Sequence, residues 1–319
     1  MTEQLLIVEN LKKYFKTDRG IVRAVDGISF FINKGETFGL VGESGSGKST
    51  TAFTIMGVYA PTAGRILFEG EEVSLTRVTK RRKSIKKEMQ MVFQDPGSSL
   101  NPRQSIKEIL ELPLKVHNIA EEKRIDKIIE LLERVELPRD YLGRYPPEIG
   151  GGEKQMIAIA RAMATEPSLI ALDEPTSALD VSMQGKIINM LMRLQSEFNY
   201  SYLFITHDLS LMRNVASRVG IMYLGKLFEV APASEFFHKP LHPYTQMLLS
   251  SIPVVTEEEE KMKPEKVVSR GEIPSPVNVP PGCVFHTRCI GCKEICLKEE
   301  PTMVEIEQGH FVRCHLFSG

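Results

Sequence analysis

A glycine-rich stretch, GESGSGKST at residues 42–50, has the residue types and spacing of a phosphate-binding loop. Its glycines let backbone N–H groups curl around an anion, and the motif places a lysine ammonium within reach of the β- and γ-phosphates of a nucleotide. A plain glycine turn at a strand end is the alternative, but it does not require the complete motif. We expect a nucleoside triphosphate to contact Gly42, Ser44, Gly45, Ser46, Gly47, Lys48, Ser49 and Thr50, with the Ser49 hydroxyl as a Mg²⁺ ligand.

Two adjacent carboxylates follow an apolar run in SLIALDEP at residues 168–175. A phosphoryl-transfer site needs one acid for the metal and one base for the attacking water, and Asp173 and Glu174 fit these roles in that order. His207 ends another apolar run, where an imidazole can bond the γ-phosphate or orient the water. Gln94 can contact Mg²⁺ or water in the same way. Each residue alone would more often be structural, so the prediction rests on their occurrence together with the loop.

These side chains need a sheet that brings them to one edge. The pattern is strand-like from about residue 4 to 43, and a glycine turn and a helix from about 48 to 56 follow it. Short apolar runs recur farther along the chain with helical patterns between several of them. We therefore predict an α/β fold with a mostly parallel core sheet. Residues 105–147 have helical periodicity without a strand nearby, which indicates a helical insertion within about 95–165.

Composition narrows the class of protein. The 319 residues suffice for a full core and a second small unit, and 40 basic against 41 acidic residues give no global argument for binding nucleic acid. One dense basic run, residues 77–89, is a candidate contact for nucleic acid or acidic lipid, but it has no interleaved aromatic residues, and we expect a solvated helix there. The sequence has no secretory signal and no apolar run of membrane-spanning length, which predicts a soluble cytoplasmic chain.

The five cysteines are unevenly placed. All of them follow residue 282, after a charged and proline-rich connection. Clustered thiols in such a chain favour a metal centre over disulfides, and thiolates suit both iron–sulfur clusters and Zn²⁺. The cysteines are Cys283, Cys289, Cys292, Cys296 and Cys314.

Five motifs of the chain occur in the order and approximate spacing of ATP-binding-cassette (ABC) ATPases, which the chain resembles. They are the phosphate loop, Gln94, the run GGGEKQ, the run LDEPTSALD and His207. The resemblance implies a P-loop ABC ATPase domain over residues 1–240, with the helical insertion inside it, and a cysteine-bearing extension over 241–319. It also implies that two such subunits close head to tail around two ATP molecules, each phosphate loop facing the signature sequence of its partner.

Further residue roles follow from the same resemblance. Asp180, in the run SALD, is implied to connect the two ATP sites across the dimer. An aromatic residue near the N-terminus normally stacks on adenine, and Phe15 is the better candidate by position, with Tyr14 beside it.

The run EIGGGEKQM, residues 148–156, stands where ABC ATPases usually have the signature Leu-Ser-Gly-Gly-Gln. Gly150 replaces the serine, and Gly151 and Gly152 follow it. A helix expected from about Glu153 to Ala164 would still direct its N-terminus at the partner's ATP. Because one hydroxyl donor is missing, we expect a heterodimer with one main hydrolytic site on this chain's own loop. The alternative is that Gly150 is tolerated in a fully working signature.

Three more runs resemble the ATPase subunits of oligopeptide and dipeptide importers. They are QDPGSSLNPR, HKPLHPYTQMLLSSIP and PPGCVFHTRC. This resemblance implies a peripheral protein at the cytoplasmic face of the membrane. Its partners would be a second ABC ATPase subunit, two transmembrane permease subunits that dock near Gln94, and, indirectly, an extracellular substrate-binding protein. Nucleic acid is not an expected partner. Alternatives are import of oligosaccharides or nickel chelates, or a soluble ABC ATPase outside transport.

In such relatives, four cysteines of this tail can hold an iron–sulfur cluster. The matching positions are Cys283, Cys289, Cys296 and Cys314, so the resemblance favours a [4Fe–4S] cluster, with Zn²⁺ as the alternative. Cys292 is an addition to that pattern and a further candidate ligand. A module in which this centre regulates the ATPase is compatible with transport.

Overall fold

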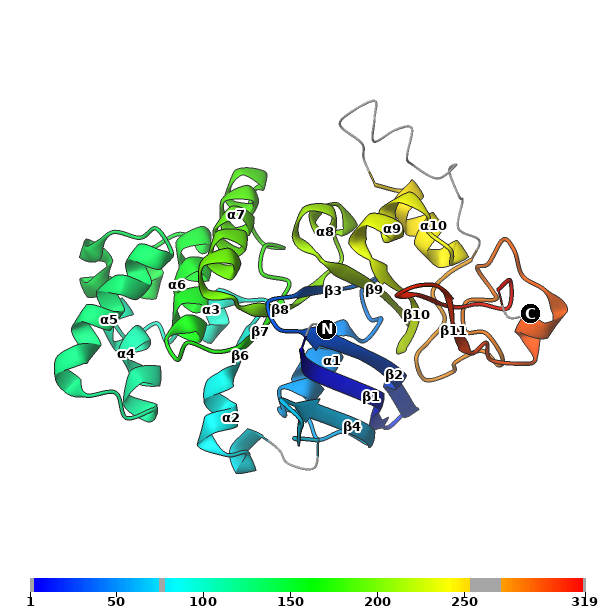
Figure 1. Ribbon diagram of the computed structural model, residues 1–319, viewed down its shortest axis with the longest axis horizontal. Coiled ribbons are helices and arrows are strands. Elements are labelled where there is room, and N and C mark those ends of the chain that lie inside the picture. The colour runs from blue at the N-terminus through cyan, green and yellow to red at the C-terminus, as the bar shows by residue number, and fades with distance from the viewer. Residues whose placement is uncertain (1–2, 75–77, 253–270, 318–319) are drawn as a thin grey trace.

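The structure, a computed structural model, describes residues 3–74, 78–252 and 271–317. Its main element is an eight-stranded sheet with the order β11-β12-β10-β9-β3-β8-β7-β6 (Figure 1). Five neighbouring strands are parallel, which confirms the predicted core sheet. They are β6 (Met89–Val92), β7 (Leu169–Asp173), β8 (Ser201–Thr206), β3 (Thr37–Val41) and β9 (Arg218–Tyr223). Antiparallel strands β10 (Lys226–Pro232), β12 (His310–Arg313) and β11 (Met303–Glu307) continue the sheet.

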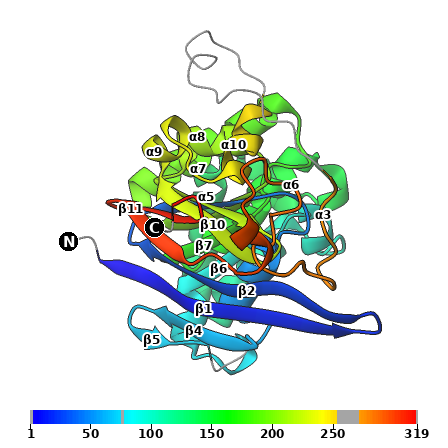
Figure 2. The same ribbon diagram turned by 90° about the vertical axis from the view of Figure 1, so that its right-hand side faces the viewer.

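A second, four-stranded antiparallel sheet has the order β2-β1-β4-β5 and lies below the main sheet in both views (Figure 2). Helix α1 (Lys48–Ile55) contacts strands of both sheets, and its buried side chains join a core that the two sheets share. The phosphate loop therefore leads into a helix that is fixed on two sides. The strands of this sheet are β1 (Gln4–Thr17), β2 (Gly20–Asn33), β4 (Ala63–Phe68) and β5 (Glu71–Glu72).

The helical insertion forms the left end of the molecule in Figure 1. It holds α3 (Pro96–Ser99), α4 (Ile106–Val116), α5 (Glu121–Arg134) and α6 (Gly151–Met163), with short 3₁₀ turns at Arg139–Gly143 and Pro146–Glu148. The upper face of the main sheet carries α7 (Val181–Phe198), α8 (Leu209–Val215), α9 (Ala233–His238) and α10 (Pro243–Ser250). No helix among these described residues is long and apolar enough to cross a membrane.

Two expectations about local structure need correction. Helix α6 begins at Gly151, two residues before the predicted start, because Gly151 and Gly152 already form its first turn. The basic run is helical only in α2 (Lys83–Glu88), after a 3₁₀ turn at Val78–Lys80, and residue 77 lies outside the described residues. Arg81 in this run is buried, and its burial lowers the pKa of the guanidinium to about 10. The run is therefore not a fully solvated helix.

The cysteine-bearing segment packs on the main domain. Strand β12 pairs with β10, so the segment adds two strands to the eight-stranded sheet. Val284 and Phe285 are buried in the main core, and Glu294–Leu297 forms a short 3₁₀ helix. Figure 2 shows this segment against the edge of the sheet at β10. Most of the charged connection expected before it, residues 253–270, lies outside the described residues.

Candidate functional site

The carboxyl ends of the parallel strands gather the residues that the sequence singles out. The phosphate loop follows β3, Asp173 ends β7, and His207 comes directly after β8. Gln94 lies two residues beyond the end of β6. Since the carboxyl ends of parallel strands meet at one edge of a sheet, four segments far apart in sequence meet there.

Two glycines of the loop have no room for a side chain. A Cβ atom on Gly47, whose φ is 106°, would lie 2.0 Å from the carbonyl oxygen of Ala24. A Cβ atom on Gly42 would lie 2.1 Å from the carbonyl oxygen of Met222. The loop therefore passes too close to neighbouring backbone for any residue other than glycine at these two positions.

Lys48 lies beneath the loop with its side chain buried. Its Nζ donates hydrogen bonds to the carbonyl oxygens of Gly42 at 2.7 Å and Glu43 at 3.0 Å. Burial lowers the pKa of Lys48, and the negative charges of Glu174 and Asp173 act against that shift. The ammonium is thus held against the backbone of the loop, and its contact with a phosphate group stays a prediction.

Ser49 and Asp173 form a pair of oxygen donors. The Ser49 hydroxyl donates to Oδ1 of Asp173 at 2.9 Å, and the Asp173 residue is only 2% exposed. Burial raises the pKa of Asp173, and the negative charge of Glu174 raises it further. The hydrogen bond from Ser49 and the positive charge of Lys48 lower the pKa, but the net shift is upward. A hydroxyl and a carboxylate at this separation match the protein ligands of Mg²⁺ in nucleotide sites, so the residues fit the metal.

Glu174 lies between Gln94 and His207. The amide Nε2 of Gln94 donates to Oε2 of Glu174 at 3.0 Å, and Nδ1 of His207 is 3.2 Å from Oε1. Glu174 has a φ of 46°, a conformation that costs a non-glycine residue about 1–2 kcal/mol. Its backbone N–H donates to the carbonyl oxygen of Ile205 at 2.9 Å, which holds that conformation. The carboxylate therefore lies between the two polar side chains that the sequence places with it.

A cavity of about 180 Å³ opens beside this carboxylate. Gln94 and Glu174 line one part of it, and Gly151, Lys154 and Gln155 from the start of α6 line another. The signature helix of this chain thus begins close to its own Gln94 and Glu174.

Gly150 is the N-cap of α6 but supplies no side-chain hydrogen bond to the first turn. Its φ of −72° and ψ of 172° suit any residue, and a Cβ atom there would meet the flexible carboxylate of Glu153 at 2.5 Å. Gly152 is buried, and a Cβ atom there would collide with the side chain of Met183. Position 150 therefore admits a serine if Glu153 moves, whereas a side chain at position 152 would have to displace the side chain of Met183.

The two candidates for adenine stacking, Tyr14 and Phe15, make different contacts in the structure. The Tyr14 hydroxyl donates to Asp26, and burial together with Asp26 raises the pKa of Tyr14 to about 12. Phe15 is half-buried and lies edge-to-face against Tyr59, with ring centroids 5.3 Å apart. Tyr14 uses its hydroxyl in a polar contact, so Phe15 remains the candidate for stacking on adenine, which stays a prediction.

Asp180 caps α7 by accepting a hydrogen bond from the N–H of Met183 at 3.0 Å, and its expected role between the ATP sites stays a prediction.

Sequence reasoning missed three residues around the loop. Glu43, within the loop itself, forms an ion pair with Arg288 and a hydrogen bond with Tyr244. The available signals were the run HPYT at residues 242–245, which carried a family resemblance but no role, and an arginine next to Cys289.

The cysteines separate into two groups by exposure. Cys283, Cys296 and Cys314 are each 7% exposed and Cys289 is half-buried, whereas Cys292 is exposed. Burial and the neighbouring cysteines raise the pKa of Cys283 to about 12 and that of Cys289 to about 11. In the described ranges, no three His, Cys, Asp or Glu side chains are arranged to hold a metal ion. Thiol sulfurs are the donor type that iron–sulfur clusters and Zn²⁺ take, and a metal bound by the four less exposed cysteines stays a prediction.

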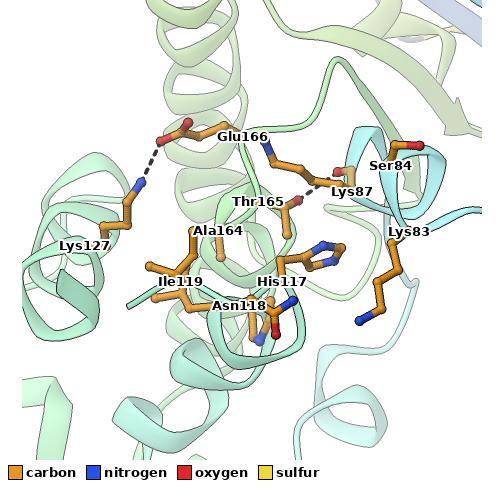
Figure 3. Close-up of a pocket in the computed structure, with 12 residues that line it drawn as sticks. Lys83, Ser84, Lys87, His117, Asn118, Ile119, Lys127, Ala164, Thr165 and Glu166 are labelled. Atoms are coloured by element: carbon orange, nitrogen blue, oxygen red, sulfur yellow. Dashed lines mark hydrogen bonds and ion pairs between the residues drawn. The ribbon is translucent and has the colours of Figure 1, made fainter. Parts of the chain in front are cut away.

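A larger cavity of about 340 Å³ lies elsewhere, between α2, α4, α5 and the end of α6 (Figure 3). Lys83, Lys87 and His117 line it, together with Lys127, which pairs with Glu166 at 3.1 Å. Burial lowers the pKa of His117, and Lys87 and Lys83 lower it further. This cavity is near the amino ends of β6 and β7, the opposite edge of the sheet from the phosphate loop, so it is not part of the site described above.

Comparisons with known proteins identify the family of the chain. The family described as "ABC transporter" matches residues 25–177, and the family described as "Oligopeptide/dipeptide transporter, C-terminal region" matches residues 228–296. The chain is 50% identical over 324 residues to the oligopeptide transport ATP-binding protein AppF of Bacillus subtilis (strain 168), covering 99% of this chain and 98% of that protein. Identity to OppF of the same organism is 44% over 316 residues, covering 98% of this chain and 97% of that protein.

A solved structure shows the same fold. It is the dimeric post-hydrolysis state of the ATP-binding cassette MJ0796 bound to ADP and Pi, with a TM-score of 0.64 and 28% identity. The match covers 72% of this chain and 99% of that chain.

The raised pKa of Asp173 predicts that Asp173→Asn stabilises the nucleotide-free protein while abolishing Mg²⁺-dependent ATP binding. Because the folded chain holds this proton more tightly than the unfolded chain, the destabilisation grows as pH rises from the unfolded pKa through the folded pKa and is complete above the folded pKa. An amide removes that effect and still accepts from Ser49. Thermal unfolding at pH 7 should show a higher melting temperature for Asp173→Asn, with no change for the exposed control Asp126→Asn. A lower melting temperature for Asp173→Asn would contradict this account.

Proposed function

Because this chain belongs to the ABC transporter family of ATP-binding proteins, we propose that it is the ATP-hydrolysing energy subunit of a membrane importer for oligopeptides or dipeptides. The observation that carries the ATPase activity is the convergence of Ser49 with Asp173, and of Gln94 and His207 with Glu174, at one edge of the sheet. The peptide cargo rests on the relatives, since nothing in the described site would touch a transported molecule.

Each residue of the site has a role in this proposal. The N–H groups of the phosphate loop and the Lys48 ammonium bind the β- and γ-phosphates. Ser49 and Asp173 hold Mg²⁺, which neutralises phosphate charge when bound, and the Gln94 amide is a further candidate ligand. Glu174 accepts the proton of the attacking water. His207 bonds the γ-phosphate and fixes the carboxylate of Glu174.

The rest of the assembly follows from the family. The chain works with a second ABC ATPase subunit and two transmembrane permease subunits, which dock near Gln94, and an extracellular binding protein delivers the cargo to them. ATP closes the ATPase pair, the closure moves the attached membrane helices, and hydrolysis resets them. The chain is then a peripheral protein at the cytoplasmic face of the membrane.

The two ATP sites of the pair are unequal in this proposal. This chain's own phosphate loop has its full set of polar residues and is completed by the partner's signature, whereas the partner's loop faces Gly150. The absence of a side-chain cap at Gly150 supports this asymmetry. A hydrogen bond to a charged group contributes about 1.5–3 kcal/mol, so the missing hydroxyl weakens closure at the partner's loop by roughly ten- to a hundredfold.

The cysteine-bearing segment is proposed to hold a [4Fe–4S] cluster through Cys283, Cys289, Cys296 and Cys314, with Zn²⁺ as the alternative. Their lower exposure supports this choice, and the exposure of Cys292 speaks against that residue as a ligand. A bound metal would favour the thiolates and stabilise a segment with little regular structure.

Glu174→Gln is expected to lower ATP turnover by about a hundredfold or more, since the amide keeps the shape of the side chain but cannot accept the proton. The measurement is ATP hydrolysis by the assembled transporter, with nucleotide binding recorded in parallel. Glu235→Gln, an exposed change elsewhere, is the matched control and should leave turnover unchanged. If Glu174→Gln retained more than about a tenth of the rate, Glu174 would not be the base.

Gly150→Ser is expected to leave turnover similar or to raise it, because the backbone already suits serine and the new hydroxyl can cap α6 and reach the partner's ATP. Gly151→Ser, where a Cβ atom has room, adds the same hydroxyl one residue later and is the control. The measurement is the rate of ATP hydrolysis by the assembled transporter, compared between the Gly150→Ser and Gly151→Ser variants. A large loss with Gly150→Ser would refute the asymmetric pair.

Protein purified without oxygen should contain iron and absorb visible light. Cys296→Ser should lose both signals, because it removes a buried ligand, whereas Cys292→Ser should keep them. Metal analysis and an absorbance spectrum are the measurements. A preparation with neither iron nor zinc would rule out a metal centre, and zinc without visible absorbance would favour the alternative metal.

A further inference from the structure

An ion pair joins the phosphate loop to the cysteine-bearing segment. Nη1 of Arg288 is 2.7 Å from Oε2 of Glu43, and Nη2 is 3.1 Å from Oε1. Two parallel hydrogen bonds between a guanidinium and a carboxylate fix both groups in direction as well as in distance. The Arg288 side chain is 7% exposed and that of Glu43 is 24% exposed, so water competes little for the guanidinium. The proposed chemistry of hydrolysis does not use this pair.

Tyr244, at the start of α10, holds the same loop residue. Its hydroxyl accepts from the backbone N–H of Glu43 at 3.1 Å and donates to the Glu43 carboxylate at 3.2 Å. The backbone N–H of Tyr244 in turn donates to Nδ1 of His242, which caps the helix. The backbone and the side chain of Glu43 are therefore both fixed by residues outside the loop.

Arg288 lies in a short turn that packs on buried aromatic rings. Phe285, three residues before it, lies 5.2 Å from Tyr244 and 5.4 Å from Tyr223 between ring centroids. The Arg288 guanidinium is 5.7 Å from the Tyr223 ring and 5.9 Å from the Phe285 ring. The backbone N–H of Arg288 donates to the carbonyl oxygen of Phe285 at 3.0 Å, which closes the turn between Cys283 and Cys289. The guanidinium is thus placed by the fold of the cysteine-bearing segment.

The contact extends to the lysine that binds phosphate. The carbonyl oxygen of Glu43 accepts a hydrogen bond from Nζ of Lys48 at 3.0 Å. A movement of Glu43 would therefore change both the path of the loop backbone and the position of the Lys48 ammonium. Glu43 therefore links Arg288 to Lys48, since its carboxylate binds the arginine and its carbonyl oxygen binds the lysine.

We propose that Arg288 is a positioning residue for ATP binding: by holding Glu43, it keeps the phosphate loop in its binding shape, so the cysteine-bearing segment sets the ATP affinity of the site. This inference rests on the proposed ATPase function. Coupling between two sites is reciprocal, so bound ATP should also hold the turn that carries Arg288.

The test measures ATP affinity of the full-length chain by titration with ATP. Arg288→Ala is expected to weaken ATP binding by about tenfold, within the usual range of coupling between sites. Arg288→Lys should recover part of the affinity, because lysine keeps the charge but not the planar fork. Glu43→Gln should also weaken binding, and adding it to Arg288→Ala should cause no further loss, since both act through one contact.

The matched control is Lys239→Ala. Lys239 also pairs with the cysteine-bearing segment, through Glu307, but away from the phosphate loop, so ATP affinity should not change. Hydrogen exchange of backbone amides 283–289 gives a second readout, independent of affinity. ATP should slow this exchange in the natural chain and leave it unchanged in Arg288→Ala.

The outcomes separate the two claims. A natural chain that does not bind ATP contradicts the proposed function itself. A natural chain that binds ATP, with Arg288→Ala and Glu43→Gln binding within about twofold of it, overturns the positioning role alone. If Arg288→Ala does not fold, Glu43→Gln gives the same decision, because it leaves the buried arginine and its aromatic neighbours in place.

Discussion

Parallel pairing of β6, β7, β8 and β3 is the constraint on which the site depends. Asp173 pairs with Ile205, and Val41 pairs with Thr206, so the carboxyl ends of neighbouring strands lie within one residue of each other in register. The loop after β3, the two carboxylates at the end of β7 and the histidine after β8 must then meet. The left-handed backbone at Glu174 follows from the same register, because its N–H bonds to the carbonyl oxygen of Ile205. A shift of the register of β7 by one residue would move Asp173 away from Ser49, and Glu174 away from Gln94 and His207.

A second constraint fixes the surroundings of the loop. The carboxylate of Glu229 on β10 is fully buried and accepts from the N–H groups of Leu241 and His242 at 2.9 and 2.8 Å. His310 on β12 lies 2.7 Å from the same carboxylate. One buried acid thus joins the start of α10, which carries Tyr244, to the strand that anchors the cysteine-bearing segment. Glu229 therefore links the helix that carries Tyr244 to a strand of the same segment that carries Arg288.

The sequence predicts what is local. The loop, the acids at the end of β7 and the helical insertion each have their signal within a few consecutive residues, and the structure brings Gln94, Glu174 and His207 together. Long-range contacts have no such signal: Arg288 and Glu43 are 245 positions apart, and no periodicity links them. For the same reason, the burial of Arg81 and the joining of β12 to the main sheet could not be predicted from charge and composition.

We conclude that this chain converts ATP hydrolysis into peptide import. Its most direct test isolates the transporter through this chain, reconstitutes it in proteoliposomes with a peptide-binding protein, and measures entry of a labelled oligopeptide. The account predicts uptake that requires Mg²⁺ and ATP on the side where this chain is exposed. It would be contradicted if the isolated assembly contained no membrane subunits, or if ATP were hydrolysed without any uptake of peptide.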